Sequence, residues 1–285
     1  MDTSPILLPA ALRQLPPLPQ VLVRALELIQ DPRSRRSELA HVLSLDQGMT
    51  GLFLRMVNSA YYGLPRRIAS LDEAIGYLGY ETVQEVIFAA SASKILSRAV
   101  PAYRLERTML WRHSVAVAAG SERVAQRRLV TPRSEVYVAG LLHDVGKLAI
   151  DLMVRHQAEW AGKPEQDPEK TAWTEVERQI TGHDHAEVGA VIVRSWNLPD
   201  RVVEAVACHH APAEAQIDLR FTSAVHIANA AALMAGIGIG VDGLRYTLDD
   251  IAIKQLDWTE SDMTSLIADM QNAVAQAEEI IGLGM

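Results

Sequence analysis

The chain has 285 residues, of which 49% are hydrophobic and 22% charged, a composition typical of a soluble globular protein with a sizeable core. Its net charge of −8 gives no reason to expect the whole molecule to bind nucleic acid or an anionic membrane. The single cysteine, Cys208, excludes an intramolecular disulfide and a cysteine-rich zinc module. There is no secretory signal pattern and no run of 18 apolar residues, so we expect a cytoplasmic protein.

The first hundred residues predict several short helices joined by tight corners. Residues 1–19 are rich in proline and predict a stiff, extended segment. Ser37 is expected to cap one helix, and Ser70 with Glu73 forms a capping box that opens another. The latter helix should stop at Gly79 before a new one begins. Apolar residues recur at intervals of three and four, which predicts helices near 20–30, 37–45, 49–57, 74–78 and 81–96.

The rest of the chain also reads as helical, with no alternation typical of strands. We expect a loop at 161–171 and a glycine-punctuated connection at 236–243. The predicted fold class is therefore all-α, a compact multi-helix protein. Three units are predicted: 1–100, 101–235 and a C-terminal extension at 236–285. One helix is expected after residue 134 and should hold His143 and Asp144, and the other helices of the last two units are expected near 105–127, 173–181, 185–196, 200–210, 221–235 and 260–281.

The main chemical signal is the stretch Gly140-Leu141-Leu142-His143-Asp144-Val145-Gly146-Lys147. An adjacent imidazole and carboxylate offer one nitrogen and one oxygen ligand to a divalent metal. Burying many imidazoles without a shared ion would require a partner for each ring nitrogen. The residues expected to converge on a metal are His113, His143, Asp144, His185, His209 and His210, with Asp184 as a further possibility.

Other sequence patterns are weaker indications of a functional site. Lys147 could contact a phosphate, or could close the end of a helix at the surface, and the sequence leaves both open. The glycines at 236–240 lack the Lys-Ser/Thr of a phosphate loop, and Cys208 beside His209 is better explained as a small core residue. Short basic groups, such as Arg66 with Arg67, are expected to be solvated.

The quoted residues resemble the HD superfamily of metal-dependent phosphohydrolases, through His113, His143-Asp144 and Gly146-Lys147. More closely, residues 12–235 resemble the HDOD family, HD-related output domains of bacterial signalling proteins. The resemblance implies an N-terminal helical half packed on an HD-like helical half, and a regulatory role with signalling proteins or a nucleotide second messenger as partners. The segments that carry it are 15–19, 43–50, 57–63, 68–79, 141–147 and 209–210.

One departure concerns the final ligand of an HD phosphohydrolase, an aspartate on a late helix. Asn229 stands at that position here, and His226, one turn earlier, is a candidate substitute. A neutral amide oxygen is a weaker ligand than a carboxylate. The Gly-Tyr-Pro motif of the related cyclic-di-GMP phosphodiesterases is also missing.

These observations favour a non-catalytic ligand- or partner-binding module with a partly retained metal site for one or two divalent ions such as iron, manganese, zinc or nickel. The alternative is a metal-dependent phosphohydrolase or phosphodiesterase acting on a nucleotide or cyclic dinucleotide, with Lys147 and Asp144 as catalytic residues. A third interpretation is a buried polar network without metal. No direct binding to nucleic acid or membrane is expected, and a homodimer is compatible with the last helix packing either on its own core or on a second subunit.

Overall fold

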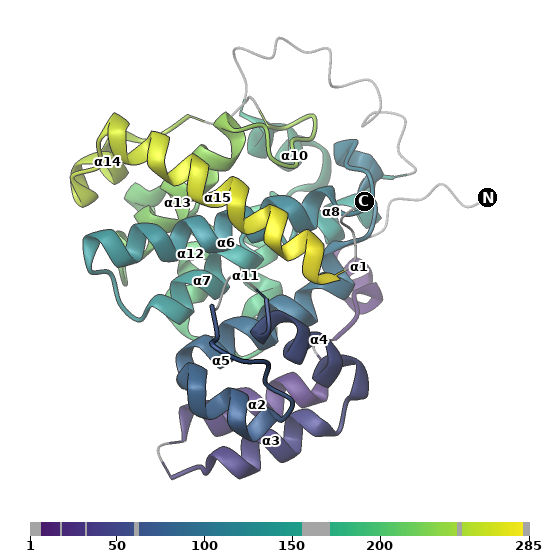
Figure 1. The fold of residues 1–285 in the computed structure, drawn as a ribbon. Coiled ribbons are helices and arrows are strands. Elements are labelled where there is room, and N and C mark those ends of the chain that lie inside the picture. The colour runs from purple at the N-terminus through teal and green to yellow at the C-terminus, as the bar shows by residue number, and fades with distance from the viewer. Residues whose placement is uncertain are drawn as a thin grey trace.

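The computed structural model describes residues 7–17, 19–31, 33–59, 63–155, 172–243 and 247–281. The regular structure in these ranges consists of helices (Figure 1). Over these residues no strand is present, and the closest approach to one is an isolated antiparallel bridge between Val100 and Leu105. The all-α prediction is confirmed. None of the described helices is both long and apolar enough to cross a membrane.

The N-terminal half is built on a long helix, α5, which has non-helical dihedrals at Gly79 (φ 75°, ψ 167°). The predicted break at this glycine is confirmed, since a positive φ is easily adopted only by glycine. Beyond the break α5 is buried almost continuously, because it packs on α2, α3 and α4 on one side and on the second half on the other. The helices of this half are α1 Leu8–Gln14, α2 Gln20–Gln30, α3 Arg36–Ser44, α4 Gln47–Val57 and α5 Leu71–Leu96.

The second half is centred on α6, which packs against α7 and α13. Its interior is lined by aliphatic and aromatic side chains with no exposed surface, among them Val117, Ala139 and Phe221. Such burial of apolar surface is the main stabilising contribution of a helical core. The elements are η1 Pro101–Tyr103, α6 Met109–Arg128, α7 Arg133–Leu142, α8 Lys147–Val154, α10 Trp173–Thr181, α11 His185–Ser195, α12 Asp200–Cys208, η3 Pro212–Glu214 and α13 Leu219–Met234.

The first and last helices each reach the opposite half of the molecule. The first helix, α1, packs against α8 of the second half. The last helix, α15 (Glu260–Ile281), follows α14 (Asp250–Leu256) and crosses α6 to reach α4, as Figure 1 shows. Leu266 and Met270 of α15 are fully buried, so this helix packs on its own chain.

Several local expectations were wrong. Residues 8–14 form α1 instead of an extended segment, because Pro9 lies in the first turn of the helix, where proline is tolerated. Ser37 does not cap α3: the N-cap residue is Arg35, whose backbone N–H donates to the Glu38 carboxylate at 3.1 Å. The next long helix begins at Met109, later than the expected 105, and α7 ends at Leu142, so His143 and Asp144 follow the helix that was expected to hold them. Helix α14 was not anticipated. The expected loop at 161–171 lies outside the described residues.

Gly146 permits the approach of helices that shapes the site. A Cβ atom at this position would lie 1.9 Å from the carbonyl oxygen of His185 and 2.6 Å from the amide nitrogen of Gly189. Any side chain would therefore separate the start of α8 from α11. The glycine after the His143-Asp144 pair is needed to bring His185 close to Asp144.

Candidate metal centre

Helix ends of the second half converge on the Asp144 carboxylate. His143 and Asp144 directly follow α7, His185 is the first residue of α11, and His209 and His210 directly follow α12. The ligand atoms of Asp144, His185, His209 and His210 lie within 4.8 Å of one another, and the same holds for His113, His143 and Asp144. The two groups share Asp144, so the predicted convergence of all six residues is present.

Backbone carbonyls hold three of these imidazoles in the same way. In each, the Nδ1–H group donates to a carbonyl oxygen, which fixes the tautomer of the neutral ring so that its lone pair is on Nε2. The pairs are His143 with Gly140 at 2.8 Å, His209 with Val206 at 2.7 Å, and His113 with Ile237 at 2.9 Å. The Nε2 atoms of all three point to Asp144, at 3.3 to 3.8 Å from its oxygens.

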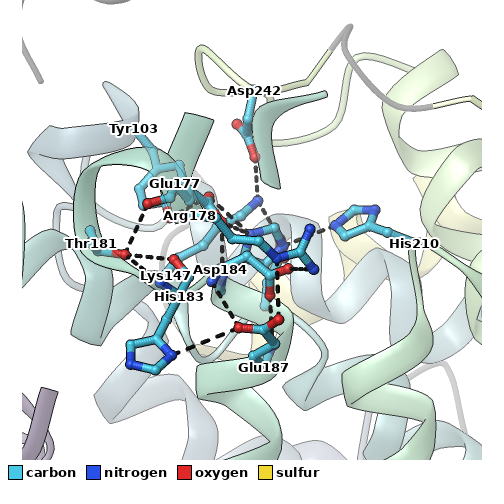
Figure 2. Close-up of polar contacts among 12 residues, drawn as sticks. Tyr103, Lys147, Glu177, Arg178, Thr181, His183, Asp184, Glu187, His210 and Asp242 are labelled. Carbon is cyan, nitrogen blue, oxygen red and sulfur yellow. Dashed lines mark hydrogen bonds and ion pairs between the residues drawn. The ribbon is translucent and has the colours of Figure 1, made fainter. Parts of the chain in front are cut away.

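A buried carboxylate positions the fourth imidazole. Glu177 on α10 has no exposed surface, and its oxygens lie 2.8 and 2.9 Å from Nδ1 of His185. Glu177 also accepts the backbone N–H of His185 at 2.8 Å and the Tyr103 hydroxyl at 2.7 Å (Figure 2). A carboxylate behind a histidine is the usual outer partner of a metal-ligating imidazole, because it orients the ring and strengthens Nε2 as a ligand.

The oxygen Oδ1 of Asp144 faces three imidazoles at distances that suit a coordination sphere. It lies 3.3 Å from His185 Nε2 and 3.8 Å from His209 Nε2, and the Nε2 atoms of His185 and His210 are 2.9 Å apart. With metal–ligand bonds of about 2.1 Å, neighbouring ligand atoms are separated by roughly 3.0 Å in an octahedron and roughly 3.4 Å in a tetrahedron. The donor atoms are therefore spaced closely enough to share one ion.

The other oxygen, Oδ2, already has a cation beside it. The Lys147 ammonium donates to Asp144 Oδ2 at 2.7 Å and lies 2.5 Å from Asp242 Oδ2, and all three side chains are almost wholly buried. Burial by itself lowers the pKa of a lysine, but Asp144 and Asp242 outweigh it and raise the pKa of Lys147 above its usual value. Figure 2 shows the ion pair of Lys147 with Asp242.

The charge states follow from burial and neighbours. Burial lowers the pKa of His113 to about 4 and also holds the pKa values of His209 and His210 well below their usual range. These rings are neutral near pH 7, as metal binding requires. Burial acts against protonation of His185 too, but Glu177 and Asp144 overcome it and raise the pKa of His185 to about 10. Burial likewise opposes ionisation of Asp144, yet His143 and Lys147 keep its pKa well below the usual value.

Asn229 joins the cluster beside His113. Its Oδ1 lies 3.1 Å from His113 Nε2, while His113 Nδ1 is held by Ile237. A neutral imidazole donates from only one nitrogen, so a cation between Nε2 and Oδ1, or an Asn229 amide turned to donate, is required here. The position at which the resemblance expects an aspartate is therefore close to the other ligands.

His226 lies next to the cluster but its ring is fully engaged. Its Nδ1 contacts the carbonyl oxygen of His209 at 2.7 Å, and its Nε2 accepts the backbone N–H of Asp249 at 2.9 Å. Accepting at Nε2 places the proton on Nδ1, which donates to His209. His226 therefore ties α13 to the end of α12 and to the start of α14, and offers no free nitrogen to an ion.

His183 and Asp184 belong to a separate network near the surface (Figure 2). The Asp184 carboxylate pairs with Arg178 and accepts the backbone N–H of Glu187 at 2.7 Å, as the N-cap of α11. His183 Nδ1 lies 3.8 Å from the Glu187 carboxylate, and the His183 side chain is 45% exposed. The structure does not bring Asp184 into the cluster, and a carboxylate at a helix start is sufficiently explained by capping.

Two contributors were missed at the sequence level, Glu177 and Asp242. Glu177 lies eight residues before His185, within the helix predicted at 173–181, and Asp242 lies in the glycine-punctuated stretch 236–243. Both carboxylates are buried, which the sequence does not reveal. The sequence signal for Glu177 was a carboxylate on the helix that precedes a candidate ligand. Many proteins have a carboxylate at such a position for other reasons.

The hollow that reaches the cluster is small. It has a volume of 130 Å³ and is lined by His210, His226 and Asn229, with apolar residues of α13 around them. Pockets that hold drug-sized ligands usually measure about 300–1,000 Å³. The described part of the site therefore has space for a few water molecules or a small anion and not for a nucleotide.

Comparison with known proteins gives one family and several similar folds. The sequence model of the HDOD domain family matches residues 15–212. A curated but uncharacterised protein of Treponema pallidum is 26% identical over 208 residues, which cover 69% of this chain and only 37% of that protein. The chain thus spans little more than a third of that relative.

Solved structures show the same architecture. An HDOD domain protein of unknown function from Geobacter sulfurreducens aligns with a TM-score of 0.74 at 25% identity, covering 94% of this chain and 93% of its own. A protein from Marinobacter aquaeolei, described as a candidate signal transduction protein, aligns with a TM-score of 0.71 at 17% identity, covering 97% of this chain and 64% of its own. At this identity the second likeness concerns the fold alone.

Proposed function

Because the chain belongs to the HDOD domain family, we propose that it is a regulatory module of signal transduction whose second half binds a divalent metal ion without hydrolysing nucleotides. Its partners are then a signalling protein or a nucleotide second messenger. The proposal concerns both the metal and the lack of turnover, and each part is supported by separate contacts.

The main support for a bound metal ion is a group of buried polar atoms that have no hydrogen-bond partner. They are His143 Nε2, His209 Nε2 and Asp144 Oδ1, all turned into the cluster. Leaving a buried donor or acceptor unsatisfied costs about 1–3 kcal/mol each. The lone-pair nitrogen of His209 and the Oδ1 oxygen cannot satisfy one another, so a cation is the group that completes them, while His143 Nε2 faces the Oδ2 side at 3.3 Å from that oxygen.

The geometry favours one ion on the Oδ1 side of Asp144. There the ligands would be Asp144, His185, His209 and His210, and a set dominated by imidazoles suits zinc, iron or nickel. On the Oδ2 side, the Lys147 ammonium lies where a second cation would be attracted. A second ion next to it would meet the repulsion of like charges in a buried environment.

Three features argue against hydrolysis. Lys147 is paired with Asp144 and Asp242 and is therefore not free to hold a substrate phosphate. Asn229 supplies no charge to a second metal. The hollow that His210, His226 and Asn229 line among the described residues measures 130 Å³, less than a nucleotide needs.

A metal-dependent phosphohydrolase remains the alternative function, on one specific observation. Asp144 belongs to both ligand groups, as a carboxylate that bridges two ions would. Turnover would require Lys147 and Asp242 to move so that the Oδ2 side opens.

The deciding experiment measures metal content by plasma mass spectrometry in protein purified without an affinity-metal step, together with Asp144→Asn and the surface control His183→Ala. We expect about one equivalent of metal in the wild type and in the control, and none in Asp144→Asn. The same preparations are then screened for hydrolysis of nucleotides and cyclic dinucleotides with added iron, manganese, zinc or nickel. Turnover that is lost in Asp144→Asn would replace the proposal with the alternative, and wild-type protein without metal would refute the metal site.

A further inference from the structure

We propose that a cavity beside the end of α4 is a second ligand site, which binds a phosphate-bearing small molecule of nucleotide size. The cavity measures 660 Å³, within the range of small-molecule sites. Its charged lining residues are Arg55, Arg66, Arg67 and Glu279. We call it the arginine cavity. It shares no lining residue with the metal centre, so it does not rest on the function proposed above.

The charge of the cavity is opposite to that of the molecule. Three guanidinium groups and one carboxylate line it, although the whole chain carries −8. Of the arginines, Arg66 pairs with the Glu73 carboxylate. Arg55 and Arg67 have no carboxylate partner among the described residues. Planar guanidinium groups bind phosphate oxygens in pairs of hydrogen bonds, so two free ones beside a hollow suit a phosphate group.

The wall behind the arginines is fixed before any ligand arrives. The Asn58 amide nitrogen donates to the carbonyl oxygens of Leu54 at 2.7 Å and Ile68 at 2.8 Å, while its oxygen accepts the Ile68 backbone N–H at 2.7 Å. This side chain therefore clamps the segment that carries Arg66 and Arg67 to the end of α4. A site whose walls are already ordered loses less entropy on binding.

An unpaired hydroxyl group lies in the same wall. Ser59 lines the cavity, and its Oγ atom is buried without a hydrogen-bond partner. A buried hydroxyl that makes no hydrogen bond is destabilising, and a phosphate oxygen that reached it would accept a hydrogen bond from the O–H group. This is an observation independent of the arginines, and it points to the same chemistry.

The position of the cavity suits a regulatory ligand. Its far wall contains Glu279 from α15, which reaches α4 from the second half. The neighbouring Glu278 pairs with Arg112 on α6, and Arg112 precedes the metal-facing His113. A ligand in the arginine cavity would therefore touch α4 and α15 together, where the two halves meet.

The test is calorimetric titration of the full chain at low salt, in EDTA, with pyrophosphate, GTP and uncharged guanosine. Saturable binding of pyrophosphate and GTP, with none for guanosine, is the expected result. Equal affinities for the first two would show that phosphate alone is recognised, and tighter GTP binding would show that the nucleoside contributes. Failure of both charged probes to bind at millimolar concentration would overturn the proposal.

Matched variants locate the site. Arg55→Gln/Arg67→Gln should weaken pyrophosphate and GTP binding at least tenfold, whereas Arg33→Gln/Arg98→Gln removes the same charge from exposed positions elsewhere and should change binding less than twofold. Arg55→Lys/Arg67→Lys keeps the charge and should still weaken binding, because lysine lacks the bidentate geometry. His209→Ala should bind both probes as the wild type does. Equal effects of the two glutamine pairs, or loss of binding only in His209→Ala, would contradict the assignment.

Discussion

The two oxygens of Asp144 face different surroundings, although they belong to one carboxylate. Oδ1 lies near the Nε2 atoms of His185 and His209 and has no hydrogen-bond partner of its own, whereas Oδ2 accepts from the Lys147 ammonium. One side is therefore short of a cation and the other already has one, supplied by the chain. The difference teaches that the number of ligand-type residues does not determine how many ions a site can hold.

Removing the shared carboxylate should have the largest effect. In Asp144→Ala, Lys147 and His185 lose a buried partner, and breaking such a pair costs roughly 3–5 kcal/mol of stability. We expect complete loss of metal and a lower urea midpoint, measured by mass spectrometry and circular dichroism. His185→Ala should lose metal with a smaller loss of stability, and metal retained in Asp144→Ala would contradict the central role of this residue.

Removing the built-in cation should change the metal count. Lys147→Met leaves Asp144 and Asp242 facing each other without a positive charge, so a second ion becomes favourable beside His113 and His143. We expect the metal content to rise from about one equivalent to about two. Asp242→Asn keeps the ammonium next to Asp144 and should remain at one. An unchanged count in Lys147→Met would show that Lys147 does not exclude the second ion.

The pH dependence should report the proton on His185. In the metal-free protein its folded pKa is about 10, above the ordinary 6.5, so its contribution to stability is present below pH 6.5 and is lost as the pH rises to about 10. Metal must displace this proton, so affinity should rise by about tenfold per pH unit between pH 7 and 9. Competition with a chelator measures this slope. Glu177→Gln removes the main charge that holds the proton and should flatten it, and a flat wild-type profile would refute the pKa.

The smallest effect on metal content and stability is expected from a substitution of His183, two residues before His185. His183 is 45% exposed and contacts Glu187 and not the cluster, so His183→Ala should keep its metal and change stability by no more than about 0.5 kcal/mol. The comparison with His185→Ala, two residues away, distinguishes a ligand from a surface residue. Equal metal loss in both variants would mean that the whole segment, and not one ring, determines binding.

The sequence predicted well what depends on local pattern. The all-α class, the break at Gly79 and the bounds of Trp173–Thr181 and Glu260–Ile281 follow from helical periodicity and from the conformational freedom of glycine. The failures have local causes as well. Pro9 is acceptable in a first helical turn, and Arg35 with Glu38 replaced the expected cap at Ser37.

The clustering of the candidate site could be predicted from the sequence, and its balance of charge could not. His113, His143, Asp144, His185, His209 and His210 could be identified because buried imidazoles need partners. Whether Lys147 was at the surface or buried depends on Asp242, which is 95 residues away and follows no helical pattern. The engaged nitrogens of His226 depend on the backbone of His209 and Asp249. Such contacts between distant segments have no signature in a single sequence.

The crossing of the first and last helices has a consequence for how the molecule unfolds. Helix α1 completes the packing of α8, and α15 completes that of α4, so each half is finished by residues from the other end of the chain. Neither half then has a complete core of its own, and contacts so far apart in sequence form late and break together. Heat should therefore melt the protein in a single cooperative transition. A cut near residue 100 would yield two fragments that regain structure only when mixed.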